Sequence, residues 1–468
     1  MEVHKISCIG AGFVGGPTMA VFAYKCPDLQ ISCLDLDPEK ISRWNSNELP
    51  IYESCLLEIV QNCRGRNLSF SNDVSNEIKN SNIIFICVNT PTKTYGEGAG
   101  CAFDLTYLES SVRSIASVLK DCTDKKIIVE KSTVAVRTAE IIEQILTHNA
   151  PGLDFSVLSN PEFLAEGTAV NDLLNPSRVL IGGKNEEAIE TLANLYARWV
   201  PRTKILTTSL WSSELSKLCS NAMLAQRISS INSISAVCER VGADIDEVST
   251  VIGTDERIGN KFLRTSVGFG GSCFTKDVLC LVYICESIGL TDVANYWRQV
   301  IIMNEFQRNR FTKCIITSMN NTLKNKHIAM FGFAYKKNTG DTRETAACYV
   351  ASTLLEEGAI IHVYDPKVTR QMMLNEMNLH KFLDFISADK HLITETNPYE
   401  AVKNSSAILV LTEWDCFKDF DYTRMFQDML KPAYIFDGRN LLNHSALREI
   451  GFRVIALGKS DFRDFRFC

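Results

Sequence analysis

A single cysteine stands directly after a run of glycines in the stretch SVGFGGSCFTKD, residues 266–277. Glycines let a backbone turn where side chains would clash, and they let it approach a ligand closely. Ser272 is the expected N-cap of a helix that begins at Cys273, where unpaired N–H groups would favour the thiolate. The alternative is a buried structural thiol, because the chain has seventeen cysteines. The glycines on one side and the KD pair on the other favour a reactive thiol.

A thiolate beside a nicotinamide has a definite chemistry. It adds to an aldehyde to give a thiohemiacetal, which can lose hydride and become a thioester that water hydrolyses to a carboxylate. The oxyanion of such an intermediate needs fixed donors. Lys217 and Asn221 are spaced i, i+4 on a predicted helix, so an ammonium and an amide point the same way, and Asp277 shares the helical face of Cys273. The alternative for Lys217 and Asn221 is an ordinary solvated helix face.

Two further stretches carry polar groups at the ends of predicted strands. Glu162 and Glu166 in NPEFLAEG are four residues apart, so they could share a helical face and position water or act as a base. The alternative is a helix N-terminus with acids in its first turn. Thr133 in EKSTV follows the apolar strand KIIV, at the end of the strand where sheet ligands bind. No histidine occurs in these stretches, so protons would move through water, lysine or carboxylates.

A nucleotide-binding turn is predicted at the start of the chain. GAGFVG, residues 10–15, is a GxGxxG between a strand and a helix, and Asp35 closes the next strand at the interval expected for a ribose-binding acid. Its glycines allow a tight turn and let pyrophosphate reach the helix N-terminus. Asp35 favours NAD over NADP because it repels a 2′-phosphate, although Lys40 lies close by in sequence. The alternative is a plain strand-to-helix turn.

The elements that must position these residues repeat along the chain. A strand, a glycine turn, a helix and a strand ending on Asp35 are matched downstream by KHIAMFGFAYKKNTGDTRE and by AIIHVYDP, which ends on Asp365. KNSNIIFICVNT and KNSSAILVLTEW each place a polar turn before a buried strand. Alternating strands and helices predict parallel sheets covered by helices. The fold class expected is α/β, with two Rossmann-like parallel-sheet domains.

A long helix is predicted between the two domains. The stretch from Trp211 to about Val241 has apolar residues at helical spacing and contains neither proline nor glycine. Ser212 or Ser213 is the expected N-cap, and Gly242 lies beyond the end. Such a helix is roughly 45 Å long, enough to bridge two domains and present a face to another subunit.

Composition narrows the class of protein. A chain of 468 residues with 46% apolar residues is expected to form two or three globular domains. Its net charge of −6 gives no basic footprint for nucleic acid or for an anionic membrane. The N-terminal stretch lacks the pattern of a leader peptide and no apolar run is long enough to span a bilayer, so a cytosolic protein is expected. The cysteines form no CxxC pair and the seven histidines do not cluster, so no metal is expected.

Taken together, nine motifs occur in one order from residue 1 to about 460. They are the GxGxxG start, VNTPT, EKSTV, NPEFLAEG, SSELSKL with Asn221, RIGNKFL, GFGGSCF.KD, AYKKNTGDTRE and FDGRN. With them the chain resembles the animal-like branch of the UDP-glucose/GDP-mannose dehydrogenase family. The resemblance implies an NAD-binding domain over 1–210, a helical dimerisation domain with the catalytic lysine and cysteine over 211–323, and a UDP-binding domain over 324–468.

The resemblance also implies a reaction, in which UDP-glucose is oxidised to UDP-glucuronate with two NAD. Cys273 is then the nucleophile, Lys217 and Asn221 stabilise alkoxide and thiohemiacetal charge, Asp277 and Thr133 position water, and Glu162 serves acid/base steps. The implied NAD contacts are Gly10, Ala11, Gly12, Phe13, Val14, Gly15, Asp35, Lys40, Val88, Asn89, Thr90, Pro91, Thr92, Ser132, Thr133, Val134, Glu166, Lys276 and Arg343. The implied substrate contacts are Glu162, Phe163, Leu164, Ala165, Glu166, Lys217, Asn221, Arg257, Arg264, Thr265, Ser266, Val267, Gly268, Phe269, Gly270, Tyr335, Lys336 and Arg439.

The chain departs from the family pattern beside the expected cofactor. Ala135 replaces a usual proline, and Cys101 and Phe103 stand where a cation and small residues are usual. Two alternatives stay open: a dehydrogenase of GDP-mannose or a UDP-N-acetylhexosamine, and a catalytically silent nucleotide-binding subunit. The resemblance further implies self-association into dimers, and of these into a hexamer as a trimer of dimers.

Overall fold

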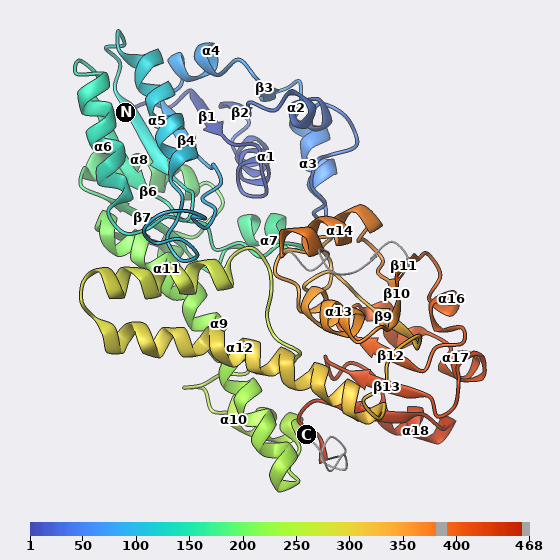
Figure 1. Cartoon of the computed structure of the whole chain (residues 1–468). Coiled ribbons are helices and arrows are strands. Elements are labelled where there is room, and N and C mark those ends of the chain that lie inside the picture. The colour runs from blue at the N-terminus through green and yellow to red at the C-terminus, as the bar shows by residue number, and fades with distance from the viewer. Residues whose placement is uncertain (381–390, 461–468) are drawn as a thin grey trace. The chain divides into compact units, whose positions relative to one another are not determined.

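The computed structural model describes residues 1–380 and 391–460 of the chain (Figure 1). The chain packs as two compact units, Met1–Ser220 and Asn221–Cys468. Each unit contains one sheet of mainly parallel strands, which confirms the predicted α/β class with two Rossmann-like domains. Within the described ranges, no helix combines the length and the apolar composition that crossing a bilayer requires.

The first unit, blue to green in Figure 1, is built on an eight-stranded sheet in the order β3-β2-β1-β4-β5-β6-β7-β8. Its inner strands are buried on both faces, as expected for a parallel sheet that helices cover. The strands are β1 (Lys5–Ile9), β2 (Gln30–Leu34), β3 (Leu68–Ser71), β4 (Ile83–Ile86), β5 (Lys126–Glu130), β6 (Phe155–Ser159), β7 (Val179–Gly183) and β8 (Ile205–Thr208).

Helices cover both faces of this sheet because alternate strand residues point to opposite sides. In β5, Ile127 and Val129 pack into a core with helices on one face of the sheet, whereas Ile128 packs into a second core with helices on the other face. The helices are α1 (Gly15–Lys25), α2 (Pro38–Trp44), α3 (Leu56–Cys63), α4 (Val74–Lys79), α5 (Thr106–Leu119), α6 (Thr138–Asn149), α7 (Ala169–Leu174) and α8 (Glu186–Tyr196), with a short 3-10 turn η1 (Arg202–Lys204).

One strand pair departs from the parallel arrangement that the sequence predicts. β7 runs antiparallel to β6 and pairs Leu158 with Gly183. A Cβ at Gly183 would lie only 2.5 Å from the Leu158 side chain, so glycine permits this close pairing. Because β6 itself is parallel to β5, the loop after β6 still lies at the carboxyl edge of the sheet.

The second unit contains a sheet whose described strands follow the order β11-β10-β9-β12-β13-β14. These strands are β9 (His327–Phe331), β10 (Ile360–Tyr364), β11 (Leu392–Glu395), β12 (Ala407–Val410), β13 (Tyr434–Asp437) and β14 (Arg453–Ala456). The helices are α9 (Leu210–Val241), whose first residues lie in the first unit, α10 (Ile245–Gly253), α11 (Phe274–Ser287), α12 (Thr291–Ser318), α13 (Ala346–Glu356), α14 (Arg370–Leu379), α16 (Pro398–Val402), α17 (Tyr422–Asp428) and α18 (His444–Ile450), with a 3-10 turn η2 (Asp415–Asp419).

The two sheets share one connectivity. Numbered from the first strand of each, both contain the order 3-2-1-4-5-6. The repeated segments KNSNIIFICVNT and KNSSAILVLTEW form β4 and β12, and each of these strands pairs with the first strand of its own sheet. The internal repeat predicted from the sequence is therefore present in the fold.

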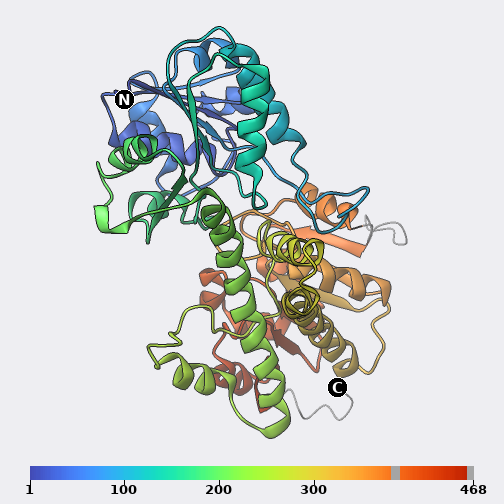
Figure 2. The same ribbon diagram turned by 90° about the vertical axis from the view of Figure 1, so that its left-hand side faces the viewer.

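The predicted long helix is confirmed as α9, which runs from Leu210 to Val241. Its start differs from the prediction, because the Ser209 hydroxyl accepts a hydrogen bond from the Ser212 backbone N–H at 3.3 Å and so provides the cap. Gly242 follows the helix in the left-handed conformation with φ 82°, as expected of a terminating glycine. In the second unit, α9 shares a small core with α11 and α12, and the latter two lie side by side, nearly end-on in Figure 2.

Candidate active site

The glycine turn after β1 has the geometry of a nucleotide-binding turn. Gly10 adopts φ 104°, and a Cβ there would lie 2.4 Å from the carbonyl oxygen of Cys87, so no other residue fits. At Gly12 an added Cβ would meet nothing within 4 Å, so this side of the turn is open. An open turn at the N-terminus of α1 suits a pyrophosphate group.

Asp35 closes β2 beside this turn. Its Oδ2 accepts a hydrogen bond from the Ala11 backbone N–H at 3.0 Å and lies 2.9 Å from Nζ of Lys40. Asp365 holds the equivalent position after β10, where its Oδ2 accepts from the backbone N–H of Phe333 at 2.7 Å. The structure thus brings Asp35, Lys40 and the first glycine turn together, as the NAD prediction requires.

The loops after β4 and β5 are joined by hydroxyl groups. Thr90 Oγ1 donates to the carbonyl oxygen of Thr133 at 2.6 Å, and Ser132 Oγ donates to that of Val88 at 2.7 Å. β2, β1, β4 and β5 are neighbours in the sheet, so their carboxyl ends form one continuous edge. Ligands of open parallel sheets bind at such an edge. The predicted cofactor residues of the VNTPT and EKSTV motifs therefore lie beside the glycine turn.

Glu162 and Lys217 form a buried ion pair. Nζ of Lys217 lies 2.9 Å from Oε1 of Glu162, and their side chains are 4% and 8% exposed. Burial alone would raise the pKa of Glu162, but the Lys217 ammonium and a backbone donor hold it below its usual range. The backbone N–H of Leu164 provides that donor, 2.6 Å from Oε2.

The helical face predicted for Glu162 and Glu166 is wrong. Residues 160–168 form a loop, and α7 begins only at Ala169. Glu162 binds the N–H of Leu164 two residues ahead, and such local bonding competes with helix formation. Glu53 fixes the far end of this loop, accepting from the backbone N–H of Gly167 at 2.6 Å and of Ala169 at 3.0 Å.

Sequence reasoning missed two cations beside Glu162. Lys131 is 3% exposed, and its ammonium lies 3.1 Å from Oδ1 of Asn160. Arg178 stacks on the ring of Phe163, with 3.7 Å between the guanidinium carbon and the ring centroid. Lys131 stands inside the EKSTV motif directly after β5, whose five residues are all buried, and the apolar run KIIV before it was the signal that this segment is buried.

A carboxyl pair lies under the other face of β5. Glu130 is buried beside Glu214 of α9, and burial together with that neighbouring carboxyl raises the pKa of Glu130 well above its usual value. Glu214 accepts hydrogen bonds from the backbone N–H groups of Arg137 and Ala139, each at 2.8 Å. Burial also raises the pKa of Glu214, but its two backbone donors oppose that shift, and through them Glu214 holds the start of α6.

In the second unit, Cys273 is the N-cap residue of α11, which begins at Phe274. The predicted helix start was therefore one residue early, and Ser272 lies just outside with its Oγ 3.4 Å from Sγ of Cys273. The Cys273 carbonyl accepts the first helical hydrogen bond, from Asp277 at 2.8 Å. Cys273 is half-buried.

The glycines before Cys273 pack against the segment between β9 and α13. A Cβ at Gly270 would lie 2.4 Å from the carbonyl oxygen of Glu344, and one at Gly271 would lie 2.8 Å from the ring of Tyr335. Gly271 also has φ 88° and donates its N–H to the carbonyl of Arg343 at 2.8 Å. The glycines are thus required for close packing, and they hold the loop that leads to the thiol.

Asn221 and Asp277 meet directly. Nδ2 of Asn221 donates to Oδ2 of Asp277 at 2.6 Å, and Asp277 is fully buried. Lys276 lies 3.2 Å from the other carboxylate oxygen. The three residues join the middle of α9 to the first turn of α11, the turn that follows Cys273.

Amide side chains hold the loop of residues 265–271 in place. Oδ1 of Asn232 accepts from the Ser266 backbone N–H at 2.9 Å, and Oδ1 of Asn304 accepts from that of Phe269 at 2.9 Å. Gln307 donates to the carbonyl of Ser266 at 2.8 Å. These contacts were not predicted, because their partners lie more than thirty residues away along the chain.

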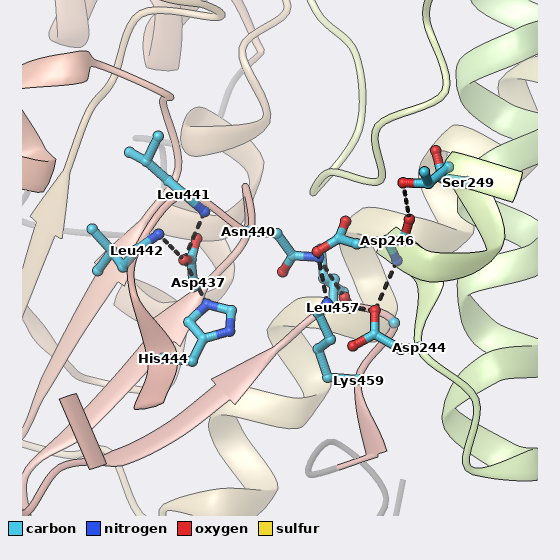
Figure 3. A network of polar contacts seen from close by, with 12 residues as sticks. Asp244, Asp246, Ser249, Asp437, Asn440, Leu441, Leu442, His444, Leu457 and Lys459 are labelled. Carbon is cyan, nitrogen blue, oxygen red and sulfur yellow. Dashed lines mark hydrogen bonds and ion pairs between the residues drawn. The ribbon is translucent and has the colours of Figure 1, made fainter. Parts of the chain in front are cut away.

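Arg439 belongs to the FDGRN turn and contacts other segments of the second unit. Its guanidinium donates to the carbonyl oxygens of Leu411 at 2.7 Å and Tyr335 at 3.0 Å, and it lies 3.3 Å from Glu413. Asp437 organises the turn, as Figure 3 shows: its Oδ2 accepts from the backbone N–H groups of Leu441 at 2.8 Å and Leu442 at 2.9 Å and contacts His444 at 3.0 Å.

The other predicted cations lie nearer the surface. Arg257 has a side chain 90% exposed and pairs with Asp255, Arg343 is 45% exposed and pairs with Asp341, and Arg264 is exposed. Lys336 is half-buried with its ammonium 5.6 Å from the centroid of the Tyr335 ring. Phe103, one of the unusual residues, is buried and bridges to Thr92 at the base of the loop between them.

A glycine turn closed by an acid belongs to a dinucleotide-binding enzyme, and a buried ammonium can stabilise the alkoxide of an alcohol undergoing oxidation. The fold and the site therefore define a nicotinamide-dependent dehydrogenase with two Rossmann-like domains. Models of three domains match this chain, all of the UDP-glucose/GDP-mannose dehydrogenase family: the NAD binding domain at residues 4–200, the central domain at 211–306 and the UDP binding domain at 329–444.

Individual proteins match over nearly the whole length. The chain is 55% identical over 468 residues to UDP-glucose 6-dehydrogenase 4 of Arabidopsis thaliana, covering 97% of each. It is 55% identical over 461 residues to UDP-glucose 6-dehydrogenase of Drosophila melanogaster, covering 97% of this chain and 96% of that protein. The fold matches a UDP-glucose dehydrogenase of Pyrobaculum islandicum with a TM-score of 0.82 at 28% identity, over 97% of both chains. The chain therefore belongs to the UDP-glucose/GDP-mannose dehydrogenase family, and the predicted cofactor, NAD, is confirmed by the match of its NAD binding domain.

Proposed function

We propose that this enzyme oxidises UDP-glucose to UDP-glucuronate with two molecules of NAD. The observation that carries the choice of substrate is the 54–55% identity, over 97% of the chain, to relatives named UDP-glucose 6-dehydrogenase. In the net reaction the 6-CH₂OH group and one water become a carboxylate, two hydrides reduce two NAD, and three protons are released.

The residues around the first glycine turn suit NAD. The open turn at Gly12 leaves room for the pyrophosphate, and Asp35 is placed to accept hydrogen bonds from ribose hydroxyls. The loops that carry Thr90 and Ser132 line the same edge of the sheet. NAD supplies the acceptor for the hydride that leaves the sugar carbon at each oxidation stage.

In the alcohol stage, the Lys217 ammonium stabilises the negative charge that develops on the substrate oxygen, and the Asn221 amide adds a second donor. Such donors act strongly because Lys217 is buried and its geometry is fixed by Glu162. The Glu162 carboxylate stays ionised, since its pKa is held low, and so can take a proton from the reacting group or from water.

In the aldehyde stage, the Cys273 thiol first releases its proton to solvent, and the resulting thiolate then adds to the carbonyl carbon. Loss of hydride from the thiohemiacetal leaves a thioester on Sγ. Asp277 and Thr133 then position a water, Glu162 takes its proton, and the C–S bond breaks to release the carboxylate and the thiol. The position of Cys273 at the N-terminus of α11 favours the thiolate form that starts this stage.

The sugar nucleotide is bound, in this proposal, by the loop of residues 265–271 and by the FDGRN turn. The loop is fixed by Asn232 and Asn304, and Arg439 is fixed by two carbonyl groups, so little ordering remains when a ligand binds. Arginine suits phosphate or carboxylate through paired hydrogen bonds.

We propose that 1–210, 211–323 and 324–468 serve as the NAD, central and UDP domains, and that the enzyme works in the cytosol. Self-association into dimers, and of these into a hexamer, is supported by apolar side chains of α9 that remain exposed, among them Met223 at 53%, Val237 at 58% and Val241 at 67%.

A substrate panel tests the proposed function. The purified protein is incubated with NAD and one of UDP-glucose, GDP-mannose or a UDP-N-acetylhexosamine, and NADH is followed at 340 nm. We expect two NADH per UDP-glucose and no free aldehyde. Faster turnover of another nucleotide sugar would replace the substrate but keep the chemistry, whereas no NADH from any of them would identify a silent nucleotide-binding subunit.

A further inference from the structure

A second lysine, Lys131, is buried beside the residue from which the loop carrying Glu162 begins. Nζ of Lys131 donates to the backbone carbonyl of Asn160 at 3.2 Å and to its Oδ1 at 3.1 Å, and lies 3.5 Å from the hydroxyl of Tyr196. These three oxygens are all neutral. Tyr196 in turn donates to Oδ1 of Asn160 at 2.7 Å, and Nδ2 of Asn160 donates to the carbonyl of Leu180 at 2.7 Å.

These contacts fix Asn160, the residue from which the loop carrying Glu162 begins. Asn160 stands at the end of β6, two residues before Glu162, and both its backbone and its side chain are bound. Pro161 then leads directly to the carboxylate. The position of the Glu162 side chain therefore depends on where Lys131 holds Asn160.

Several titratable groups of the described chain act on the charge of Lys131. The titratable groups that interact with it are Glu162, Lys217, Cys8, Cys87 and Tyr196. Burial raises the pKa of both Cys8 and Tyr196 well above neutrality, so these two carry no charge at pH 7. Glu162 is a carboxylate that acts on both Lys131 and Lys217, and burial followed by the nearby Lys217 lowers the pKa of Lys131, while Cys87 and Glu162 raise it.

We propose that Lys131 is a positioning residue for this oxidation: its buried ammonium holds Asn160 in place and keeps the neighbouring Glu162 carboxylate charged. The kinetic consequence rests on the proposed function, whereas the hold of Lys131 on Asn160, two residues before Glu162, rests on the printed contacts of Lys131. Lys131 contacts no reacting atom, and it acts through Glu162.

The kinetic test replaces Lys131 with methionine, which removes the ammonium and keeps a long unbranched side chain. Without that charge Glu162 is more easily protonated, so the acidic limb of the kcat/KM profile should move up by about one pH unit. Asn160→Asp, which puts a carboxylate beside Lys131, should move the limb in the same direction. This second variant decides the matter if Lys131→Met fails to fold.

Lys126, the first residue of β5, offers a matched control for Lys131, which directly follows that strand. It is 2% exposed, and its ammonium donates to the carbonyls of Lys79 at 3.1 Å and Ser81 at 2.8 Å, under the opposite face of the sheet. Lys126→Met should lower stability but leave the acidic limb in place. An unmoved limb in Lys131→Met, or an equal movement in both variants, would overturn the proposal.

A second measurement needs no activity. Glu162→Gln should lower the Tm more in the wild-type background, where it leaves two ammonium groups without their anion, than in the Lys131→Met background. In Lys126→Met its effect should equal that in wild type. If Glu162→Gln lowered the Tm equally in all three backgrounds, Lys131 and Glu162 would not be coupled, whatever the enzyme oxidises. If the wild type made no NADH, the proposed function would be wrong, but this comparison of Tm values would still hold.

Discussion

The ammonium of Lys217 lies 2.9 Å from Oε1 of Glu162, and neither side chain is more than 8% exposed. A cation and an anion so enclosed each keep the other charged, because separating them would leave an unpaired charge in the interior. Lys217 comes from α9 and Glu162 from the loop after β6. The pair therefore joins a rigid helix to a loop at the carboxyl edge of the first sheet, where a proton acceptor and a stabilising cation are both available.

Replacing Lys217 with alanine should reduce kcat by roughly 100- to 1,000-fold, because one donor to the developing oxyanion is lost. NAD binding should be nearly unchanged, since Lys217 lies outside the first glycine turn; titration calorimetry with NAD measures this. Lys184→Ala is the control, because it removes an exposed lysine that pairs with Glu143 at 2.7 Å. A loss of activity as large in the control would assign the effect to stability.

Cys273→Ser should nearly abolish NADH formation from UDP-glucose. A serine hydroxyl lacks the nucleophilicity of the thiolate, and an ester on it would hydrolyse slowly. Cys280→Ser, a change of a buried cysteine farther along α11, should retain most of the activity. The two variants are compared by initial rates of NADH formation and by mass spectrometry of the protein, which detects a sugar covalently bound to it. Normal acid formation by Cys273→Ala would leave the cysteine with a purely structural role.

Asp35→Ala should narrow the preference for NAD over NADP by about tenfold or more, because it removes the ribose acceptor and the repulsion of a 2′-phosphate. Lys40 would then lose the partner 2.9 Å away and present its charge to the phosphate. Asp365→Ala is the matched control at the equivalent position of the second sheet. It should leave the ratio of kcat/KM values for the two cofactors unchanged. A wild type that uses both cofactors equally contradicts the role given to Asp35.

Glu130→Gln should stabilise the protein at neutral pH. The pKa of Glu130 is raised in the folded protein by burial and by Glu214, whereas the unfolded chain releases this proton near pH 4.3. The wild type therefore loses stability as the pH rises from about 4.3 toward the folded pKa, and glutamine removes this loss. The Tm difference between variant and wild type should be near zero at about pH 4 and should grow toward neutrality.

The control for that experiment is Glu109→Gln, which alters a half-exposed glutamate of α5 that pairs with Arg113 at 3.7 Å. Its Tm difference should stay small and flat across the same range. A Glu130→Gln variant that is less stable than wild type at pH 7 would show that the carboxyl provides a contact that an amide cannot replace.

Light scattering tests the proposed assembly. At micromolar concentration we expect the mass of at least a dimer, because apolar side chains of α9 are left in water in the single chain. Val237→Lys combined with Val241→Lys should reduce the mass, while Leu57→Lys on α3 should not. A wild-type protein that is purely monomeric would contradict the proposal.

Sequence patterns predicted the features that depend on near neighbours. The turn at Gly10, the acid at Asp35 and the extent of α9 each follow from a local period or motif, and all three are present. Helix starts were less accurate, because the choice between Ser209 and Ser212, or between Ser272 and Cys273, depends on backbone angles that composition does not determine.

The features that were missed depend on distant partners. Lys131 stood inside a motif already identified, but its role depends on Asn160 and Tyr196, which lie 29 and 65 residues away. The stretch NPEFLAEG was expected to be a loop, but a shared helical face was suggested for Glu162 and Glu166 because carboxylates four apart fit a helix. Only the tertiary contacts of Glu162 with Lys217 and of Glu53 with the loop reveal the actual conformation.

The close packing at Gly270 and Gly271 limits how the gene can change. Every single-base change in a glycine codon that alters the amino acid introduces at least one Cβ atom. At Gly270 that atom would lie 2.4 Å from a backbone oxygen of Glu344, which no compensating side-chain change can remove. At Gly271 a smaller residue in place of Tyr335 could relieve the contact, but the φ of 88° would still resist a side chain. Substitutions of Gly270 should therefore be absent from natural variants. Substitutions of Gly271 should occur only together with a smaller residue in place of Tyr335.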